Sequence, residues 1–210
     1  MLPVEPHAEI IRHMEAHCAP VHENALIEIV PGHPSIRVHV IPPTAERPWT
    51  TLFTAGMSDK PMTVPEGYEE YRFVELMIHL PPDWPLSPEE CRDPDHSWPV
   101  RMLKKIAYLP HLDDTWLGPP PTILSNDEPP QPFAPNVPFT CMVLFPQSGE
   151  AGRLETRDGQ DIRLYWMLPI FTEERDVERE KGMEHLFDLF DRHEVPLVVD
   201  VDRASVADLE

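Results

Sequence analysis

Two hundred and ten residues carry 37 acidic and 17 basic side chains, so the formal net charge is 17 − 37 = −20 at neutral pH. The hydrophobic fraction of 41% is enough for a folded domain with its own core, which argues against a disordered chain. A surface this negative repels a phosphate backbone and an anionic lipid headgroup. The composition therefore predicts a protein that binds neither nucleic acid nor a membrane.

Sequence signals for export or membrane insertion are missing. The N-terminal residues show no basic stretch followed by an apolar core, and no stretch approaches the ~18 apolar residues of a membrane span. Cys18, Cys91 and Cys141 are an odd number of widely spaced thiols without a CxxC motif, which is typical of a reducing compartment. We expect a cytoplasmic protein without a disulfide framework.

Apolar periodicity in the first half predicts one helix and then four strands. A short apolar stripe indicates a helix from Glu5 to Cys18. The strands that follow are predicted at Ala25–Val30, Ile36–Ile41, Trp49–Ala55 and Tyr71–Leu80. The last of these is apolar on both faces, which is typical of a central strand covered on both sides. Glu75 is the exception, because its carboxylate lies between Phe73 and Met77 in a row that should be buried.

The second half predicts two helices, two core strands and a final strand. A helix is expected from about Trp98 to Leu109, with Ser97 as its N-cap. Eight of the twenty residues from Pro119 to Pro138 are proline, which predicts a loop with restricted backbone angles. The remaining predictions are strands at Phe139–Phe145 and Ile162–Leu168, one helix from about Glu173 to Arg192, and a closing strand at Pro196–Val201.

This order of elements mixes hairpin-like neighbours with helices. It predicts an α+β fold, a single domain over residues 1–210 with its core at about 20–205, in which helices flank a mixed, mostly antiparallel β-sheet. No internal repeat and no break in composition requires a second domain.

The known motifs of metal, phosphate and nucleophile sites are absent from the sequence. Neither GxGxxG nor GxxxxGK[ST] occurs, and there is no GxSxG or HExxH. Glu9, His13 and His17 share one helix face but provide too few ligands for a closed site, so a solvated surface is the simpler interpretation. Cys91 with His96 does not match a catalytic cysteine pattern. We therefore predict that the protein holds no metal and no cofactor and is not an enzyme.

Two carboxylates stand out as candidate functional residues. Asp59 follows a glycine-bearing turn at the end of a strand, and Glu75 occupies a row that should be buried. An unpaired buried carboxylate costs several kcal/mol or becomes protonated. For each residue two interpretations stay open. The first is structural, a bond to backbone amides or to an arginine such as Arg72 or Arg101. The second is a functional contact.

An ordered set of short motifs resembles the suppressor of fused domain. The motifs are Arg47-Pro48-Trp49-Thr50-Thr51-Leu52-Phe53-Thr54-Ala55-Gly56-Met57-Ser58-Asp59, Phe73-Val74-Glu75-Leu76, Trp98-Pro99 with Leu103, Trp116, Val137-Pro138-Phe139, Lys181-Gly182 with Leu186, and Val199-Asp200-x-x-Arg203. The resemblance extends over almost the whole chain, from about residue 20 to 205. Animal members of this family restrain Gli transcription factors in Hedgehog signalling and carry the domain as their N-terminal half, whereas this chain resembles a stand-alone, bacterial member.

The resemblance implies a non-catalytic protein-binding module. Animal members bind a short peptide as an added strand between two domains, and acidic residues of a Ser-Asp turn and a Phe-x-Glu-Leu strand help to hold it. These positions match Asp59 and Glu75, which are therefore the predicted partner-binding residues. The family further suggests an immunity protein that neutralises a toxin, and a charge of −20 would steer the chain towards a basic toxin.

Two other functions remain open at this point. The first is a chaperone-like binder of extended peptides, which a proline-rich surface with many strand edges would suit. The second is a hydrolase in which Asp59 and Glu75 act with histidines such as His79 or His111. Convergence of these four groups in one pocket would favour the hydrolase, and their dispersal would argue against it.

Overall fold

The structure is a computed structural model that describes residues 7–23, 26–27 and 34–209. Its strands are β1 (Leu26–Ile27), β2 (Arg37–Ile41), β3 (Thr50–Ala55), β4 (Phe73–Leu80), β5 (Thr122–Ser125), β6 (Cys141–Pro146), β7 (Arg153–Glu155) and β8 (Asp161–Ile170). The α-helices are α1 (Ala8–His17), α2 (Pro94–Leu112), α3 (Thr172–Lys181) and α4 (Met183–Arg192). Short 3₁₀ turns lie at Met57–Asp59, Glu69–Tyr71, Glu90–Arg92 and Glu150–Gly152.

One eight-stranded sheet organises the molecule. Its order is β1-β2-β3-β4-β8-β6-β5, and β7 pairs with β8 outside this path. Every strand pairing is antiparallel except that of β4 with β8, where Glu75 lies opposite Leu164. The predicted α+β class with a mixed, mostly antiparallel sheet is confirmed.

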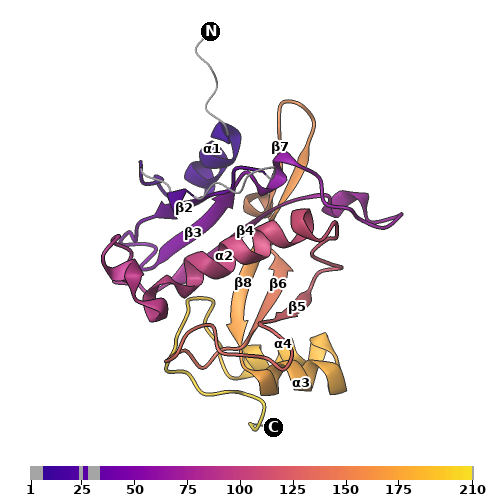
Figure 1. Cartoon of the computed structure of the whole chain (residues 1–210). Coiled ribbons are helices and arrows are strands. Elements are labelled where there is room, and N and C mark those ends of the chain that lie inside the picture. Colours follow the sequence, from indigo (N-terminus) through magenta and orange to yellow (C-terminus); the bar gives the residue numbers. More distant parts are fainter. Residues whose placement is uncertain (1–6, 24–25, 28–33, 210) are drawn as a thin grey trace.

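Helix α2 covers one face of this sheet (Figure 1). Its Trp98 and Leu103 pack with Leu76 and Ile78 of β4 in the largest buried cluster. Strand β4 lies in the middle of the sheet with both faces buried, as its doubly apolar pattern predicts. The central strand and the long helix therefore form the rigid frame that positions the loops around them.

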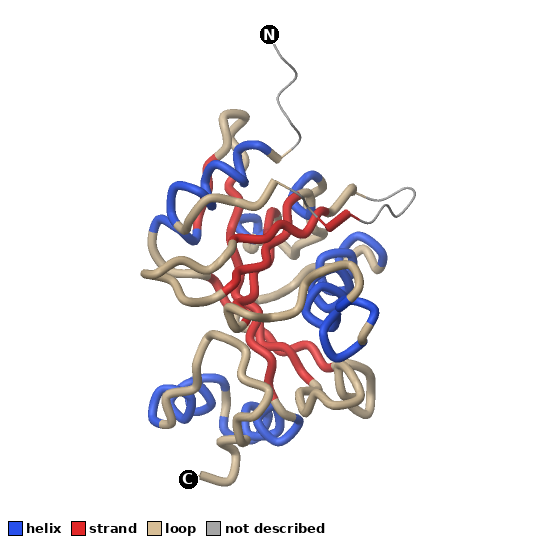
Figure 2. Tube along the Cα trace, turned by 90° about the vertical axis from the view of Figure 1, so that its left-hand side faces the viewer, coloured by secondary structure: helices blue, strands red, loops and turns tan. Residues whose placement is uncertain are grey.

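The opposite face is covered by two separate helical groups (Figure 2). Ile10 and Met14 of α1 pack against Phe53 at one end of this face. Leu186 of α4 packs against Ile170 at the other end. In the described part of the chain, no helix combines the length and the apolar character needed to span a bilayer.

Several predicted elements have different boundaries in the structure. Helix α2 begins at Pro94, earlier than the predicted Trp98, because the Asp93 side chain caps it by accepting from the Asp95 backbone N–H. The proline-rich loop, which was predicted without a strand, contains the short strand β5. The predicted strand at Ala25–Val30 lies largely outside the described residues, which include only β1 of it.

Two predictions at the C-terminal end are wrong. The single helix from Glu173 to Arg192 is divided into α3 and α4, because Gly182 adopts a φ of 90°, which no helix interior tolerates. The closing strand at Pro196–Val201 does not form. Only Val198 makes an isolated parallel bridge, to His79, and the backbone then enters turns.

A buried ion pair fixes the C-terminal segment to α3. Arg203 donates from both terminal nitrogens to the Glu174 carboxylate, at 2.6 and 2.7 Å, and Glu174 is fully buried. The same carboxylate accepts the backbone N–H groups of Phe171 and Val206. The Arg203 guanidinium also lies over the rings of Phe139 and Phe171. One carboxylate therefore connects the start of α3 to the last residues of the chain.

Replacement of the cation should destabilise the fold strongly. Arg203→Met leaves a buried carboxylate without its countercharge, and we expect a loss of about 3 kcal/mol in the free energy of unfolding, measured by urea denaturation. The double variant Arg203→Met/Glu174→Gln should recover part of this loss, because it removes the unpaired charge. A loss below about 1 kcal/mol in the single variant would contradict the assignment.

Candidate functional site

The candidate site is the turn that follows β3, residues 56–59, which we call the Asp59 turn. It begins at Gly56, whose φ of 112° lies in the left-handed region. A Cβ at this position would lie 2.5 Å from the Ser35 carbonyl oxygen, so only glycine fits there. The chain then forms one 3₁₀ turn over Met57–Asp59.

A buried carboxylate from the neighbouring strand holds the Asp59 turn in place. Oε1 of Glu75 accepts the backbone N–H groups of Gly56 at 2.9 Å and Ser58 at 3.0 Å, and the Ser58 hydroxyl at 2.6 Å. Oε2 accepts the Thr54 hydroxyl at 2.6 Å. Thr54 Oγ1 itself accepts the Leu76 backbone N–H at 2.8 Å. Glu75 thereby ties β3, the turn and β4 together.

Burial and hydrogen bonding act on this carboxyl group in opposite directions. Glu75 is fully buried, and loss of solvation raises its pKa above the usual range. The hydrogen bonds from Ser58, Thr54 and Gly56 favour the charged form and limit that rise. The group is thus an internal anchor whose cost of burial is offset by four donors.

Two histidines complete the Asp59 turn from opposite sides. His111 of α2 contacts the Met57 carbonyl oxygen through Nε2 at 3.0 Å, so Nε2 carries the donated proton. His7, at the start of α1, lies with Nε2 2.9 Å from Oδ2 of Asp59. The Asp59 side chain is still 50% exposed. The turn therefore presents one carboxylate at the surface on a backbone that is held from three elements.

The two predicted site residues have different positions in the structure. Asp59 is at the surface, where a partner can reach it. Glu75 has no exposed surface, and its bonds to the amides of Gly56 and Ser58 agree with the structural interpretation. Neither Arg72 nor Arg101 pairs with it. A role of either carboxylate in partner binding stays a prediction, and for Glu75 such a role would act through the shape of the turn.

The four groups of the hydrolase hypothesis do not converge on one pocket. Glu75 is buried beneath the Asp59 turn on the α1 face of the sheet, whereas His111 reaches the turn from α2. His79 lies further along β4, where Nδ1 contacts the Thr51 hydroxyl at 2.9 Å. Their dispersal removes the observation on which a hydrolase using these residues depends.

His79 lies in an aromatic and cationic environment at that end of β4. Its ring is 4.2 Å from that of Trp166, in an edge-on arrangement. Arg47 donates to Thr51 Oγ1 at 2.8 Å, the same oxygen that Nδ1 of His79 contacts. Burial, with a smaller contribution from Arg47, lowers the pKa of His79 to about 3. Burial likewise lowers the pKa of His39 to about 4.

Two of the side chains that were weighed as metal ligands on α1 contact the segment around β7. His13 Nε2 lies 3.0 Å from the Ala151 carbonyl oxygen, and Glu9 accepts the Arg157 backbone N–H. Within residues 7–23, 26–27 and 34–209, no three His, Cys, Asp or Glu side chains are grouped so that they could hold a metal ion.

Comparison with known families identifies this fold. A family model described as suppressor of fused protein (SUFU) matches residues 32–204. The chain belongs to the suppressor of fused family. The match confirms the resemblance of the ordered motifs, and both the Asp59 turn and β4 lie within the matched residues. No curated protein matches the chain.

Solved structures share the SUFU fold at low sequence identity. A SUFU homologue from Neisseria gonorrhoeae is 17% identical, with a TM-score of 0.67 and 97% of both chains covered. Drosophila Suppressor of Fused is 15% identical with a TM-score of 0.61, and the match spans 97% of this chain but 52% of the Drosophila chain. A chain in the crystal structure of the Sufu–Fu complex is 13% identical with a TM-score of 0.59, covering 97% of this chain and 93% of that one.

Removal of the Glu75 carboxylate should destabilise the SUFU domain. Glu75→Ala leaves the Gly56 and Ser58 amides and two hydroxyls buried without an acceptor, and we expect a loss of about 3 to 5 kcal/mol in the free energy of unfolding. Glu75→Gln keeps an acceptor oxygen and should cost less than half as much.

The control is the pH dependence of the stability of wild type and Glu75→Gln, measured by urea denaturation at several pH values. Because the folded-state pKa of Glu75 is raised, wild-type stability is fully present below the ordinary value of 4.5 and declines as pH rises through the folded-state pKa. The gap between wild type and Glu75→Gln should therefore narrow with rising pH. Equal losses in the Ala and Gln variants would contradict this account of the turn.

Acid should destabilise the SUFU domain through His79. Because its pKa is lowered from 6.5 to about 3, its contribution is fully present above pH 6.5 and is lost as the pH falls towards 3. Between pH 7 and pH 5 the wild type should lose about 2 kcal/mol more than His79→Asn, which retains a polar group near Thr51 but does not titrate. Urea denaturation at both pH values measures this difference, in which the His39 contribution cancels. Equal losses of stability in wild type and His79→Asn between these pH values would show that His79 is protonated without cost.

Proposed function

We propose that this SUFU-family chain is a non-catalytic protein-binding module and that the Asp59 turn belongs to its contact surface. The observation that carries the proposal is the half-exposed Asp59 carboxylate on a turn whose backbone is fixed by Glu75 and His111. A pre-organised charged turn loses little conformational entropy on binding, which is a general route to affinity. The crystal structure of the Sufu–Fu complex contains a relative bound to a protein, which supports the same class of function.

Within this class we propose an immunity protein whose partner is a basic toxin. The net charge of −20 supports this finer function, because opposite charge accelerates encounter with a basic protein and makes it salt-dependent. All three cysteines carry free thiols, which suits a cytoplasmic location.

A second candidate is a binder of extended peptides. Strand β5 is the last strand of the sheet and pairs only with β6, and all four of its residues are partly exposed. A strand edge of this kind can accept a peptide through main-chain hydrogen bonds. Capture of the partner from cells, described below, separates the two candidates. An immunity protein should recover one structured basic protein, whereas a peptide binder should recover a set of unfolded chains.

Charge reversal at Asp59 should abolish capture of the partner. We expect Asp59→Lys to weaken binding at least about tenfold, because it places a cation where the partner meets a carboxylate. Tagged protein would be isolated from its native cells, and the bound chains would be identified by mass spectrometry and then measured by calorimetry.

Asp191→Lys provides a matched control, since Asp191 is exposed on α4 and the charge change is the same. Circular dichroism verifies that both variants fold. Equal binding by wild type and Asp59→Lys would place the contact surface elsewhere. Repeated recovery of no protein at all would argue against a binding module.

A further inference from the structure

A cluster of three aromatic side chains lies at the surface near the C-terminal end of α2. Tyr68, Tyr71 and Trp116, which we call the aromatic patch, have ring centroids 4.9 to 6.5 Å apart. Tyr71 and Trp116 rest on the main core, and Tyr68 is 37% exposed. A Cβ at Gly118 would lie 2.8 Å from Cζ3 of Trp116, so glycine allows this ring to lie against the backbone. The patch is therefore anchored on one side and open at Tyr68.

The segments that carry these rings are strongly acidic. Residues 63–72 and 112–118 contain five carboxylates and one cation, Arg72, a net charge of 1 − 5 = −4. The five carboxylates, all on exposed residues, belong to Glu66, Glu69, Glu70, Asp113 and Asp114. We call these five carboxylates the acidic rim; exposed aromatic rings that share their segments with carboxylates are complementary to a cation with a planar, weakly hydrated group.

One arginine of this chain already uses part of the patch. The Arg163 guanidinium lies 5.3 Å from the ring centroid of Tyr71, and it forms an ion pair with Glu70. This arrangement combines stacking on an aromatic ring with a charge-assisted hydrogen bond. Tyr68 is a second ring of the patch, and Glu66 precedes it by two residues in the sequence; the structure gives neither of them a cationic partner among the described residues.

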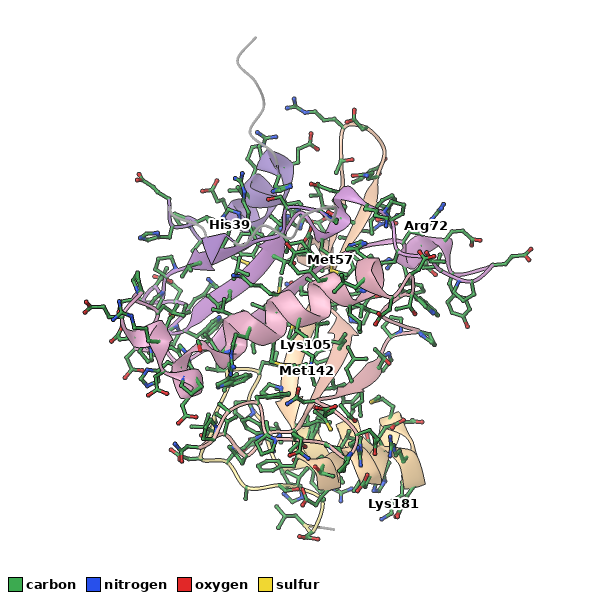
Figure 3. All side chains as sticks on the ribbon, viewed as in Figure 1. His39, Met57, Arg72, Lys105, Met142 and Lys181 are labelled. Atoms are coloured by element: carbon green, nitrogen blue, oxygen red, sulfur yellow. The ribbon has the colours of Figure 1, made fainter. Side chains whose placement is uncertain are left out.

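A backbone hydrogen bond connects the segment after the Asp59 turn to the segment that carries the aromatic patch. The Met62 backbone N–H donates to the Arg72 carbonyl oxygen at 2.8 Å, which joins the segment after the turn to the segment that carries Tyr68 and Tyr71. Met57 and Arg72 lie towards the same end of α2 (Figure 3). The two features therefore lie on connected segments that border the same end of α2.

We propose that the aromatic patch binds an arginine side chain from a cationic segment of the protein partner. The guanidinium stacks on the Tyr68 ring beside Trp116 and pairs with carboxylates of the acidic rim, chiefly Glu66. This inference rests on the proposed function and specifies the chemistry of the partner. The arginine stem covers the exposed ring, and the Asp59 carboxylate meets a second cationic group of the same segment.

A defined peptide tests this chemistry without knowledge of the natural partner. The probe is a ten-residue peptide of glycine and serine with four arginines, and the control peptide carries citrulline at the same positions. Two-dimensional ¹H–¹⁵N NMR follows the indole N–H signal of Trp116, which the Trp116→Phe variant assigns. We expect a saturable shift of this signal with the arginine peptide and none with the citrulline peptide. Equal shifts with both peptides, or no shift with either, would overturn the proposal.

Charge variants distinguish this surface from general attraction to an acidic protein. Glu66→Gln/Glu69→Gln should raise the Kd of the arginine peptide about fivefold to tenfold. Asp188→Asn/Asp191→Asn makes the same charge change on exposed positions of α4, and it should raise the Kd less than about twofold, because salt screens distant charges. Tyr68→Ala removes the most exposed ring and should also abolish the Trp116 shift. Equal weakening by both charge variants would overturn the proposal.

Failure of this inference can be told apart from failure of the proposed function. If Asp59→Lys abolishes capture of the natural partner while Tyr68→Ala and Glu66→Gln/Glu69→Gln leave it unchanged, the aromatic patch is not a contact surface and the binding module stands. If the patch variants raise the Kd of the natural partner at least about fivefold, the inference is supported on the natural ligand as well.

Discussion

The fully buried carboxylate of Glu75 is the interaction on which the candidate site depends. It accepts four hydrogen bonds, three of them from the turn that ends in Asp59 and one from Thr54 of the adjacent strand. A carboxylate without these donors would be very costly at this depth, and the donors without the carboxylate would be equally unsatisfied. The turn and the central strand therefore stabilise each other, and the surface geometry around Asp59 is a consequence of an interaction in the core.

This arrangement separates the residue that shapes the surface from the residue that can touch a partner. Glu75 has no exposed area, whereas Asp59 is half exposed and the aromatic patch of Tyr68, Tyr71 and Trp116 is open at Tyr68. Both features lie at the C-terminal end of α2, which is held against the main face of the sheet by the largest buried cluster. A rigid frame with a negative, partly aromatic edge suits recognition of a cationic protein surface.

The sequence predicted the fold class and the central strand, and it singled out position 75 because alternating apolar residues make a single carboxylate conspicuous; the partner-binding role given to Glu75 stays a prediction. It could not predict the partners of Glu75, which come from the register between β3 and β4 and from the positive φ of Gly56. The break at Gly182 was not predicted, because the apolar stripe of this region, Met183 to Phe190, lies wholly after the glycine and shows no interruption. The contact of His7 with Asp59 joins residues 52 positions apart, and no local pattern encodes such a pairing.

Amide hydrogen exchange at Gly56 and Ser58 tests the central claim most directly. Both N–H groups lie in a turn near the surface and would exchange quickly if the turn were held only by its own local contacts. If they donate to a buried Glu75 carboxylate, they should exchange about as slowly as the amides of the central strand, and Glu75→Gln should accelerate both more than it accelerates the β6 and β8 amides, which report the global loss of stability. Rapid exchange in the wild type, or rates unaffected by the substitution, would contradict the account.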